Sequence, residues 1–155
     1  MRGSSAVGDF NIVSQWLLSK RIDEYSADKT PPTVLVNTPK NSGTVIAGAN
    51  GKALIDARIS DNIGNARVDF YIDNVLQYAV PVRLQRTTQT TPAYYSSSAA
   101  VSWDIKNFAA GSAHTIYAKV YDLTGNSAVS LAIKVTVGTQ TPTVTSVNGQ
   151  QTISP

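Results

Sequence analysis

The central part of the chain, from Thr33 to Val137, alternates apolar and polar residues in short runs that Gly, Asn and Pro separate. In the run from Lys52 to Ile59, every second residue is apolar and most of the residues between them are polar. Because a period of two places alternate side chains on opposite faces, this pattern predicts a β-strand with one buried face. The same period recurs in runs around the following residues: Val34, Val68, Val80, Val101, Ile116 and Val135.

These runs predict an all-β fold. About seven strands follow one another at spacings near ten residues, and no run with a helical period lies between them. Parallel sheets need long crossover connections, usually helices, so the pattern excludes them and favours two antiparallel sheets packed as a β-sandwich. We expect Trp103 to be the largest side chain of the core, with Arg67 and Asp69 on the outer surface.

One segment before the strands has a helical period. Between Asp9 and Tyr25, the residues Phe10, Val13, Trp16 and Leu17 recur at spacings of three and four and form one apolar stripe. The pattern predicts a short N-terminal amphipathic helix, which would be only marginally stable alone in water. The stripe either covers one end of the sandwich or docks on a partner as an assembly element.

Composition shifts divide the chain into three parts. Residues 1–30 are a leader with the helix, interpreted either as the remnant of an upstream domain or as an assembly arm. The prolines Pro31 and Pro32 end that part, and residues 31–138 form the sandwich. Residues 139–155 are a polar tail or linker, in which Thr143–Val147 has the composition of a strand that a neighbouring domain or subunit could pair with.

Charge and cysteine content exclude several classes of protein. Only 15% of the 155 residues are charged, and the 13 Lys and Arg residues that give the net charge of +3 are scattered along the chain. Nucleic-acid binders concentrate such residues on one face, so we expect no nucleic-acid partner. The chain has no cysteine and therefore no disulfide or thiolate metal site. No apolar run is long enough for a membrane span.

The segment from Val82 to Ser98 contains the candidate interaction residues Arg83, Arg86, Tyr94 and Tyr95. Tyrosine and arginine carry much of the binding energy at protein interfaces, and tyrosine pairs also stack on sugar rings. The alternative is a long hairpin whose tyrosines pack along their own sheet. A glycan or a host-surface protein is the partner that the first interpretation predicts.

Four aspartates, Asp61, Asp73, Asp104 and Asp122, are predicted to lie at strand ends beside Asn, Gly or another turn residue. The default interpretation is turn chemistry without any metal or cofactor, because aspartate side chains cap turns. Calcium, which takes six to eight oxygen ligands, is the alternative, with Asp61 and Asp122 as its candidate ligands. The single histidine, His114, has no nucleophile motif near it, so we expect no catalytic site.

The order of several motifs resembles bacterial immunoglobulin-like (Big) domains of extracellular and surface proteins. The segments that carry the resemblance are Pro31–Val34, Ser60–Gly64, Val68–Leu76, Val101–Asp104, Gly111–Ile116 and Val120–Ser127. The resemblance implies an immunoglobulin-like sandwich over roughly residues 31 to 137. The chain departs from the family pattern at Val82–Ser98, which is longer than usual and contains either extended hairpin arms or an inserted loop.

The resemblance implies a non-catalytic module, outside the cell or on its surface, that acts as a spacer, an adhesion unit or a protein-interaction unit of a larger protein. Its partners would be neighbouring domains or subunits of the same assembly. Two alternatives stay open. The chain could be the structural subunit of a surface filament or phage particle that assembles through its terminal arms, or a carbohydrate-binding accessory module.

Overall fold

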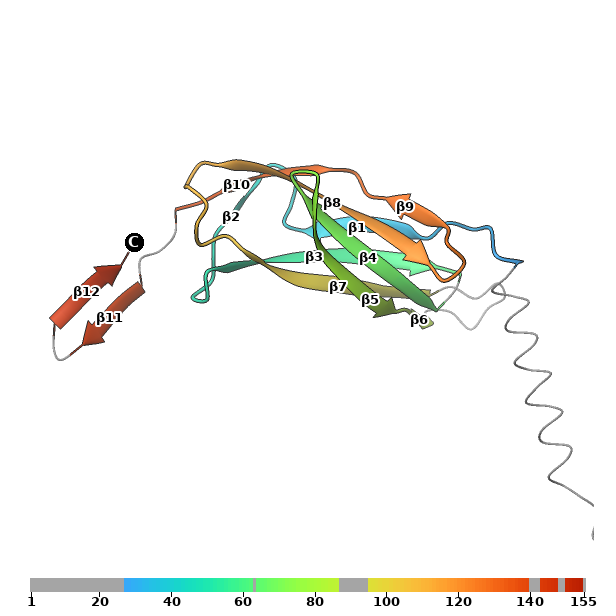
Figure 1. Cartoon of the computed structure of the whole chain (residues 1–155), viewed down its shortest axis with the longest axis horizontal. Coiled ribbons are helices and arrows are strands. Elements are labelled where there is room, and N and C mark those ends of the chain that lie inside the picture. The colour runs from blue at the N-terminus through green and yellow to red at the C-terminus, as the bar shows by residue number, and fades with distance from the viewer. Residues whose placement is uncertain (1–26, 63, 87–94, 140–142, 148–149, 155) are drawn as a thin grey trace, which may run out of the picture.

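The structure, a computed structural model, describes residues 27–62, 64–86, 95–139, 143–147 and 150–154. The predicted helix from Asp9 to Tyr25 lies outside the described residues, and so do its stripe residues, which were Phe10, Val13, Trp16 and Leu17. That helix stays a prediction. The described residues contain β-strands and turns arranged as two packed sheets (Figure 1).

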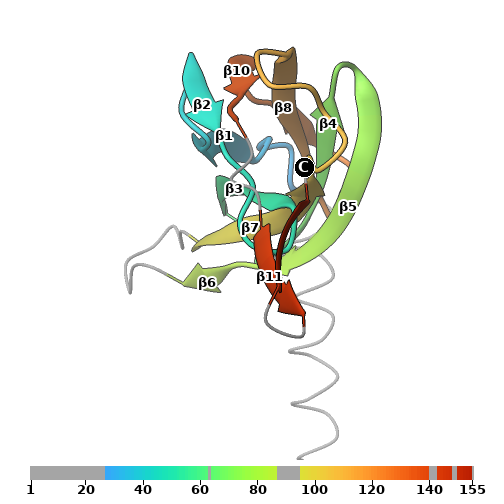
Figure 2. The ribbon, with the colours of Figure 1, turned by 90° about the vertical axis from the view of Figure 1, so that its left-hand side faces the viewer.

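The strands divide into a four-stranded and a six-stranded sheet, seen from one end of the sandwich in Figure 2. The order in the first sheet is β1 (Thr33–Thr38), β3 (Lys52–Asp61), β7 (Tyr95–Asp104) and β6 (Gln85–Arg86). The order in the second is β2 (Gly43–Val45), β10 (Ile133–Val137), β8 (Ala113–Asp122), β4 (Asn65–Ile72) and β5 (Val75–Arg83), and β9 (Ser127–Val129) also pairs with β8. A separate hairpin joins β11 (Thr143–Val147) and β12 (Gln150–Ser154).

The predicted alternation builds the core between the two sheets. On β8, Ile116, Ala118 and Val120 are fully buried, and the residues between them are half-buried on the outer face. Phe70 on β4 is likewise fully buried, and Trp103 on β7 is 4% exposed. The all-β sandwich and the buried position of Trp103 are therefore confirmed.

Two expectations about the strands are corrected. The estimate of about seven strands is too low, because the two sheets contain ten described strands. Two of the additional strands are short: β6, which the chain reaches from β5 through the buried Leu84 in the opposite sheet, and β9, which residues 130–132 separate from β10. The pairing is also not wholly antiparallel, since β2 runs parallel to β10, with Val45 beside Val137.

Two surface expectations also change. Asp69 points outward as expected but is only 4% exposed, because the Arg67 guanidinium covers it at 3.1 Å between Nε and Oδ1. The strand expected at Thr143–Val147 is present as β11, but its partner is β12 of the same chain rather than a neighbouring domain.

Strand β8 runs between two ends of the sandwich that hold different parts of the chain. Before its first residue, the Gly111 N–H donates to the Val137 carbonyl at 2.7 Å, so the last strand of the sandwich finishes there. Beyond its last residue, the Asn126 amide donates to the Asp28 carbonyl at 3.3 Å, so the chain begins the sandwich at that end. The end with Asp28 is termed the inlet end and the end with Val137 the outlet end.

Candidate functional site

Three buried aspartates meet at the inlet end and are termed the aspartate cluster. Asp28 comes from the segment that precedes β1, Asp61 ends β3 and Asp122 ends β8. Their exposed fractions are 8%, 4% and 7%, and one carboxylate oxygen of each lies within 4.8 Å of those of the others. The cluster therefore combines one carboxylate from the end of a strand in each sheet with a third carboxylate from the segment that enters the sandwich.

Asp122 is fixed by the turn that follows β8. Its Oδ1 accepts hydrogen bonds from the Thr124 N–H at 2.8 Å, the Thr124 hydroxyl at 2.9 Å and the Asn126 N–H at 2.9 Å. Its Oδ2 accepts one bond from the Asn126 side-chain amide at 2.7 Å. The turn function expected of this aspartate is present, and the bonds hold its carboxylate in one orientation toward the cluster.

Asp28 is held through only one of its two oxygens. Its Oδ1 accepts hydrogen bonds from the Thr30 N–H at 3.0 Å and the Asn62 amide at 2.8 Å, whereas its buried Oδ2 has no hydrogen-bond partner. Burial by itself would raise the pKa of the Asp28 carboxyl, but the hydrogen bonds from Asn62 and Thr30 outweigh it, so the pKa lies below its ordinary value. The group is therefore charged at neutral pH.

The arrangement suits a cation chemically. Carboxylate oxygens are the ligands that hard divalent cations prefer, and three of them converge here without a water-exposed face. The ion pairs among the described residues involve Asp69, Asp104 and Asp73, and none of these pairs includes Asp28 or Asp122.

The structure thus brings together two of the four aspartates considered from the sequence, Asp61 and Asp122. Asp104 pairs instead with Lys106 at 3.4 Å, and Asp73 contacts His114. Sequence reasoning missed Asp28, because the segment before the two prolines reads only as a helix breaker. The sequence feature that could have indicated Asp28 is its position a few residues before a strand whose start is fixed by two prolines. One of these prolines, Pro32, is fully buried.

His114, near the outlet end, is the centre of a second polar group. Its Nδ1 lies 2.6 Å from Asp73 Oδ2 and its Nε2 lies 3.1 Å from the Ser112 hydroxyl, which is the connectivity of a Ser-His-Asp triad. Two backbone N–H groups next to the Ser112 hydroxyl are already used, because Gly111 donates to Val137 and Ser112 donates to the Ala109 carbonyl at 3.0 Å.

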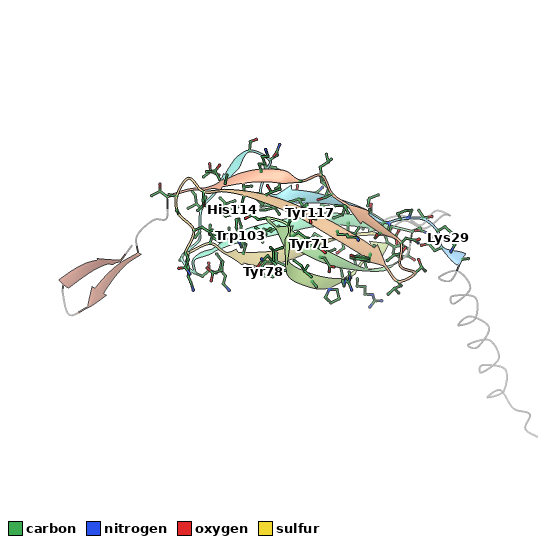
Figure 3. All side chains as sticks on the ribbon, turned by 45° about the horizontal axis from the view of Figure 1, so that its top comes forward. Lys29, Tyr71, Tyr78, Trp103, His114 and Tyr117 are labelled. Atoms are coloured by element: carbon green, nitrogen blue, oxygen red, sulfur yellow. The ribbon has the colours of Figure 1, made fainter. Side chains whose placement is uncertain are left out.

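The His114 ring is also enclosed by aromatic side chains. Its centroid lies 5.3 Å from that of Trp103 and 4.5 Å from that of Phe108, both in edge-on contact, and the residue is 9% exposed. Figure 3 shows Trp103 and His114 on the side of the sandwich opposite Lys29, which follows Asp28. The His114 ring therefore packs the outlet end, whereas half of the Asp73 side chain is exposed.

The candidate interaction residues lie apart from both groups. Tyr94 is outside the described residues. Tyr95 starts β7 opposite Arg86 of β6, and its ring is half-buried against the core beside Gly64. Arg83 is exposed at the end of β5. An interaction through these residues stays a prediction.

Comparison with known proteins places this sandwich in a family. A sequence profile of the bacterial Ig domain family matches residues 32–118, which is more than half of the chain. The chain therefore belongs to the bacterial Ig domain family, as its motifs predicted. A search of curated protein sequences gave no match.

Three solved structures are similar to the chain at low sequence identity. The fibronectin(III)-like modules of Clostridium thermocellum CbhA are 20% identical, with a TM-score of 0.45 over 68% of this chain and 96% of that chain. The CARDB domain of a Pyrococcus furiosus protein, in complex with di-metal ions, is 19% identical, with a TM-score of 0.47 over 69% and 92%. A variant of the SrpA adhesin from Streptococcus sanguinis is 14% identical, with a TM-score of 0.43 over 83% and 72%.

Proposed function

We propose that the chain is a non-catalytic spacer or adhesion module of a bacterial surface or secreted protein. The observation that carries the proposal is that the chain enters the sandwich at one end and leaves it at the other. Asp28 lies beyond the last residue of β8 and Val137 lies beside its first, so the chain enters and leaves at opposite ends. Ten residues of extended strand separate these ends by about 30 Å.

Opposite ends favour a serial arrangement. In a module whose inlet and outlet lie side by side, the polypeptide returns to the point where it entered. In this module the outlet lies at the other end, so each module adds its own length to a row of modules. Membership of the bacterial Ig domain family is consistent with the proposal. No helix among the described residues is long and apolar enough to cross a bilayer.

The polar groups support a role without catalysis. The Ser112, His114 and Asp73 side chains are connected like a hydrolase triad, but the neighbouring N–H groups of Gly111 and Ser112 donate to backbone carbonyls. A triad without oxyanion donors loses the electrostatic stabilisation that usually contributes most to acyl transfer.

Small-angle scattering of one, two and three fused copies of the complete chain tests the spacer proposal. We expect the maximum dimension to increase with each added copy by at least about 30 Å, the length of β8. Light scattering on the same samples gives the mass. A maximum dimension that stays nearly constant would contradict the spacer role, and a mass above that of one copy for the single chain would favour the filament alternative.

A further inference from the structure

The aspartate cluster gathers three acidic side chains in one buried place at the inlet end. Three carboxylates are buried within 4.8 Å of one another, and within the described part of the chain no Lys, Arg or His side chain forms an ion pair with Asp28 or Asp122. Burying charges of one sign together is unfavourable both through lost hydration and through mutual repulsion. A bound cation removes both costs.

A second observation points to a ligand at the same place. The Asp28 side chain is 8% exposed, yet only its Oδ1 has hydrogen-bond donors, and its Oδ2 is buried without a partner. One carboxylate oxygen of Asp122 and one of Asp61 lie within 4.8 Å of an oxygen of Asp28. A buried carboxylate oxygen without a donor that faces other carboxylates has the surroundings of a metal ligand rather than of a turn residue.

The spacing of the oxygens fits calcium, and the number of buried carboxylates favours calcium over magnesium, because magnesium usually keeps several waters and takes only one or two carboxylates. Calcium binds oxygen at about 2.3 to 2.6 Å, so two ligands on opposite sides of one ion lie up to roughly 5 Å apart, whereas the limit for magnesium is roughly 4.2 Å. The oxygens of the cluster lie within 4.8 Å of one another. Three carboxylates, each bound through one or two oxygens, supply about three to six of the six to eight ligands of calcium.

We propose that Asp28, Asp61 and Asp122 form a calcium site that fastens the incoming segment to the ends of β3 and β8. Asp61 and Asp122 belong to opposite sheets, and Asp28 precedes the first strand. The ion therefore joins the two sheets to each other and fixes the direction in which the chain enters the sandwich. The inference concerns the inlet end alone and holds whether or not the module is a spacer.

Thermal unfolding of the complete chain, first in EDTA and then in CaCl2 up to about 10 mM, tests the site. Calcium sites of extracellular modules have dissociation constants near 0.1 to 1 mM. We expect the Tm to rise by roughly 5 to 10 °C at the highest concentration, and isothermal titration to give one site per chain. An unchanged Tm in calcium would overturn the proposal, and an equal rise in MgCl2 would overturn the choice of calcium.

The variant Asp28→Asn separates metal binding from general effects of calcium. It keeps the shape of the side chain but removes one charge, so we expect it to lose most of the calcium-dependent rise in Tm. In EDTA it should fold like the parent chain, because the asparagine Oδ1 can still accept the hydrogen bonds from Thr30 and Asn62. Asp104→Asn, which removes an exposed carboxylate outside the cluster, should keep the full rise. A calcium response of Asp28→Asn equal to that of the parent would contradict the site.

Proteolysis by a lysine-specific endoproteinase gives a local readout that does not depend on a variant. Lys29 is exposed and follows Asp28, so calcium should slow cleavage after Lys29 several-fold by holding the segment in place. Cleavage after Lys106, exposed away from the cluster, should change little when unfolding is rare. Equal rates after Lys29 with and without calcium would show that no ion fastens the segment.

Discussion

Single residues at the outlet end show how polar and aromatic side chains close a sandwich. Trp103 faces the core from β7, and the rings of Phe108 and His114 pack against it with centroids at 5.5 and 5.3 Å. Asp73 in turn holds His114 through its Nδ1. The charged group at the surface thus orients the ring that covers the largest core residue.

Trp103→Ala should lower the free energy of unfolding by about 3 to 5 kcal/mol, because it removes a 4%-exposed indole and leaves a cavity between the sheets. Urea unfolding followed by circular dichroism measures the change. Leu54→Ala is the matched control, since Leu54 lies on the adjacent strand β3 but is 55% exposed, and it should cost below about 1 kcal/mol. Equal losses in the two variants would contradict the placement of the core.

Asp73 should make stability depend on pH in the acid range. Partial burial raises the pKa of its carboxyl, but the hydrogen bonds from His114 and the Thr115 N–H, with the charge of His114, lower it below the ordinary value. A lowered pKa means that the carboxylate stabilises the fold above about pH 4, and that this stabilisation is lost as the pH falls through the folded-state pKa.

The variant Asp73→Asn isolates that contribution, because asparagine also tolerates the positive φ of 50° at this turn position. We expect it to be less stable than the parent by about 1 kcal/mol at pH 6, a modest value because half of the Asp73 side chain is exposed. The difference should shrink toward zero by about pH 2. Parallel stability curves for the two proteins from pH 6 to pH 2 would rule out this role.

At the scale of elements, the buried Ser130 continues the pairing with β8 across the gap between β9 and β10. Between β9 and β10, the Ser130 N–H donates to the Ala118 carbonyl at 2.8 Å, and the Ser130 hydroxyl accepts from the Ala118 N–H at 3.0 Å. The hydroxyl also donates to the Leu131 carbonyl. The Ser130 hydroxyl therefore takes the place of a backbone carbonyl as the acceptor for the Ala118 N–H of β8.

Ser130→Ala should cost about 1 to 3 kcal/mol, because it leaves the buried Ala118 N–H without an acceptor. Chemical denaturation gives the stability, and amide hydrogen exchange should show faster exchange at Ala118. Ser127→Ala, an exposed position on β9, is the control and should change the stability by less than about 0.5 kcal/mol. Unchanged exchange at Ala118 in the Ser130 variant would refute the bridging role.

The strands themselves were predictable because their buried faces follow a local period of two. The alternation at Ile116, Ala118 and Val120 needs only the neighbouring residues to be recognised. The pairing of β2 with β10 was not predictable in the same way. It joins Val45 to Val137 across most of the chain, through a three-residue strand that is too short to show a period.

At the scale of the whole molecule, the aspartate cluster was only partly visible in the sequence. Asp61 and Asp122 were recognised because each follows a predicted strand and precedes a turn. Their proximity, and the addition of Asp28, depend on how two sheets stack and on where a segment without regular structure docks. Such contacts between distant parts of the chain leave no local pattern in the sequence.

The parallel pairing of β2 and β10 has a mechanical consequence for a chain pulled from its two termini. Tension would draw β2 by its first residue and β10 by its last, in opposite directions along the same ladder. The three rungs from Gly43 to Val45 are then loaded in shear and must rupture together, whereas a hairpin pulled open from one side would unzip bond by bond. A strand of only three residues is therefore placed where stretching loads all of its ladder bonds at once.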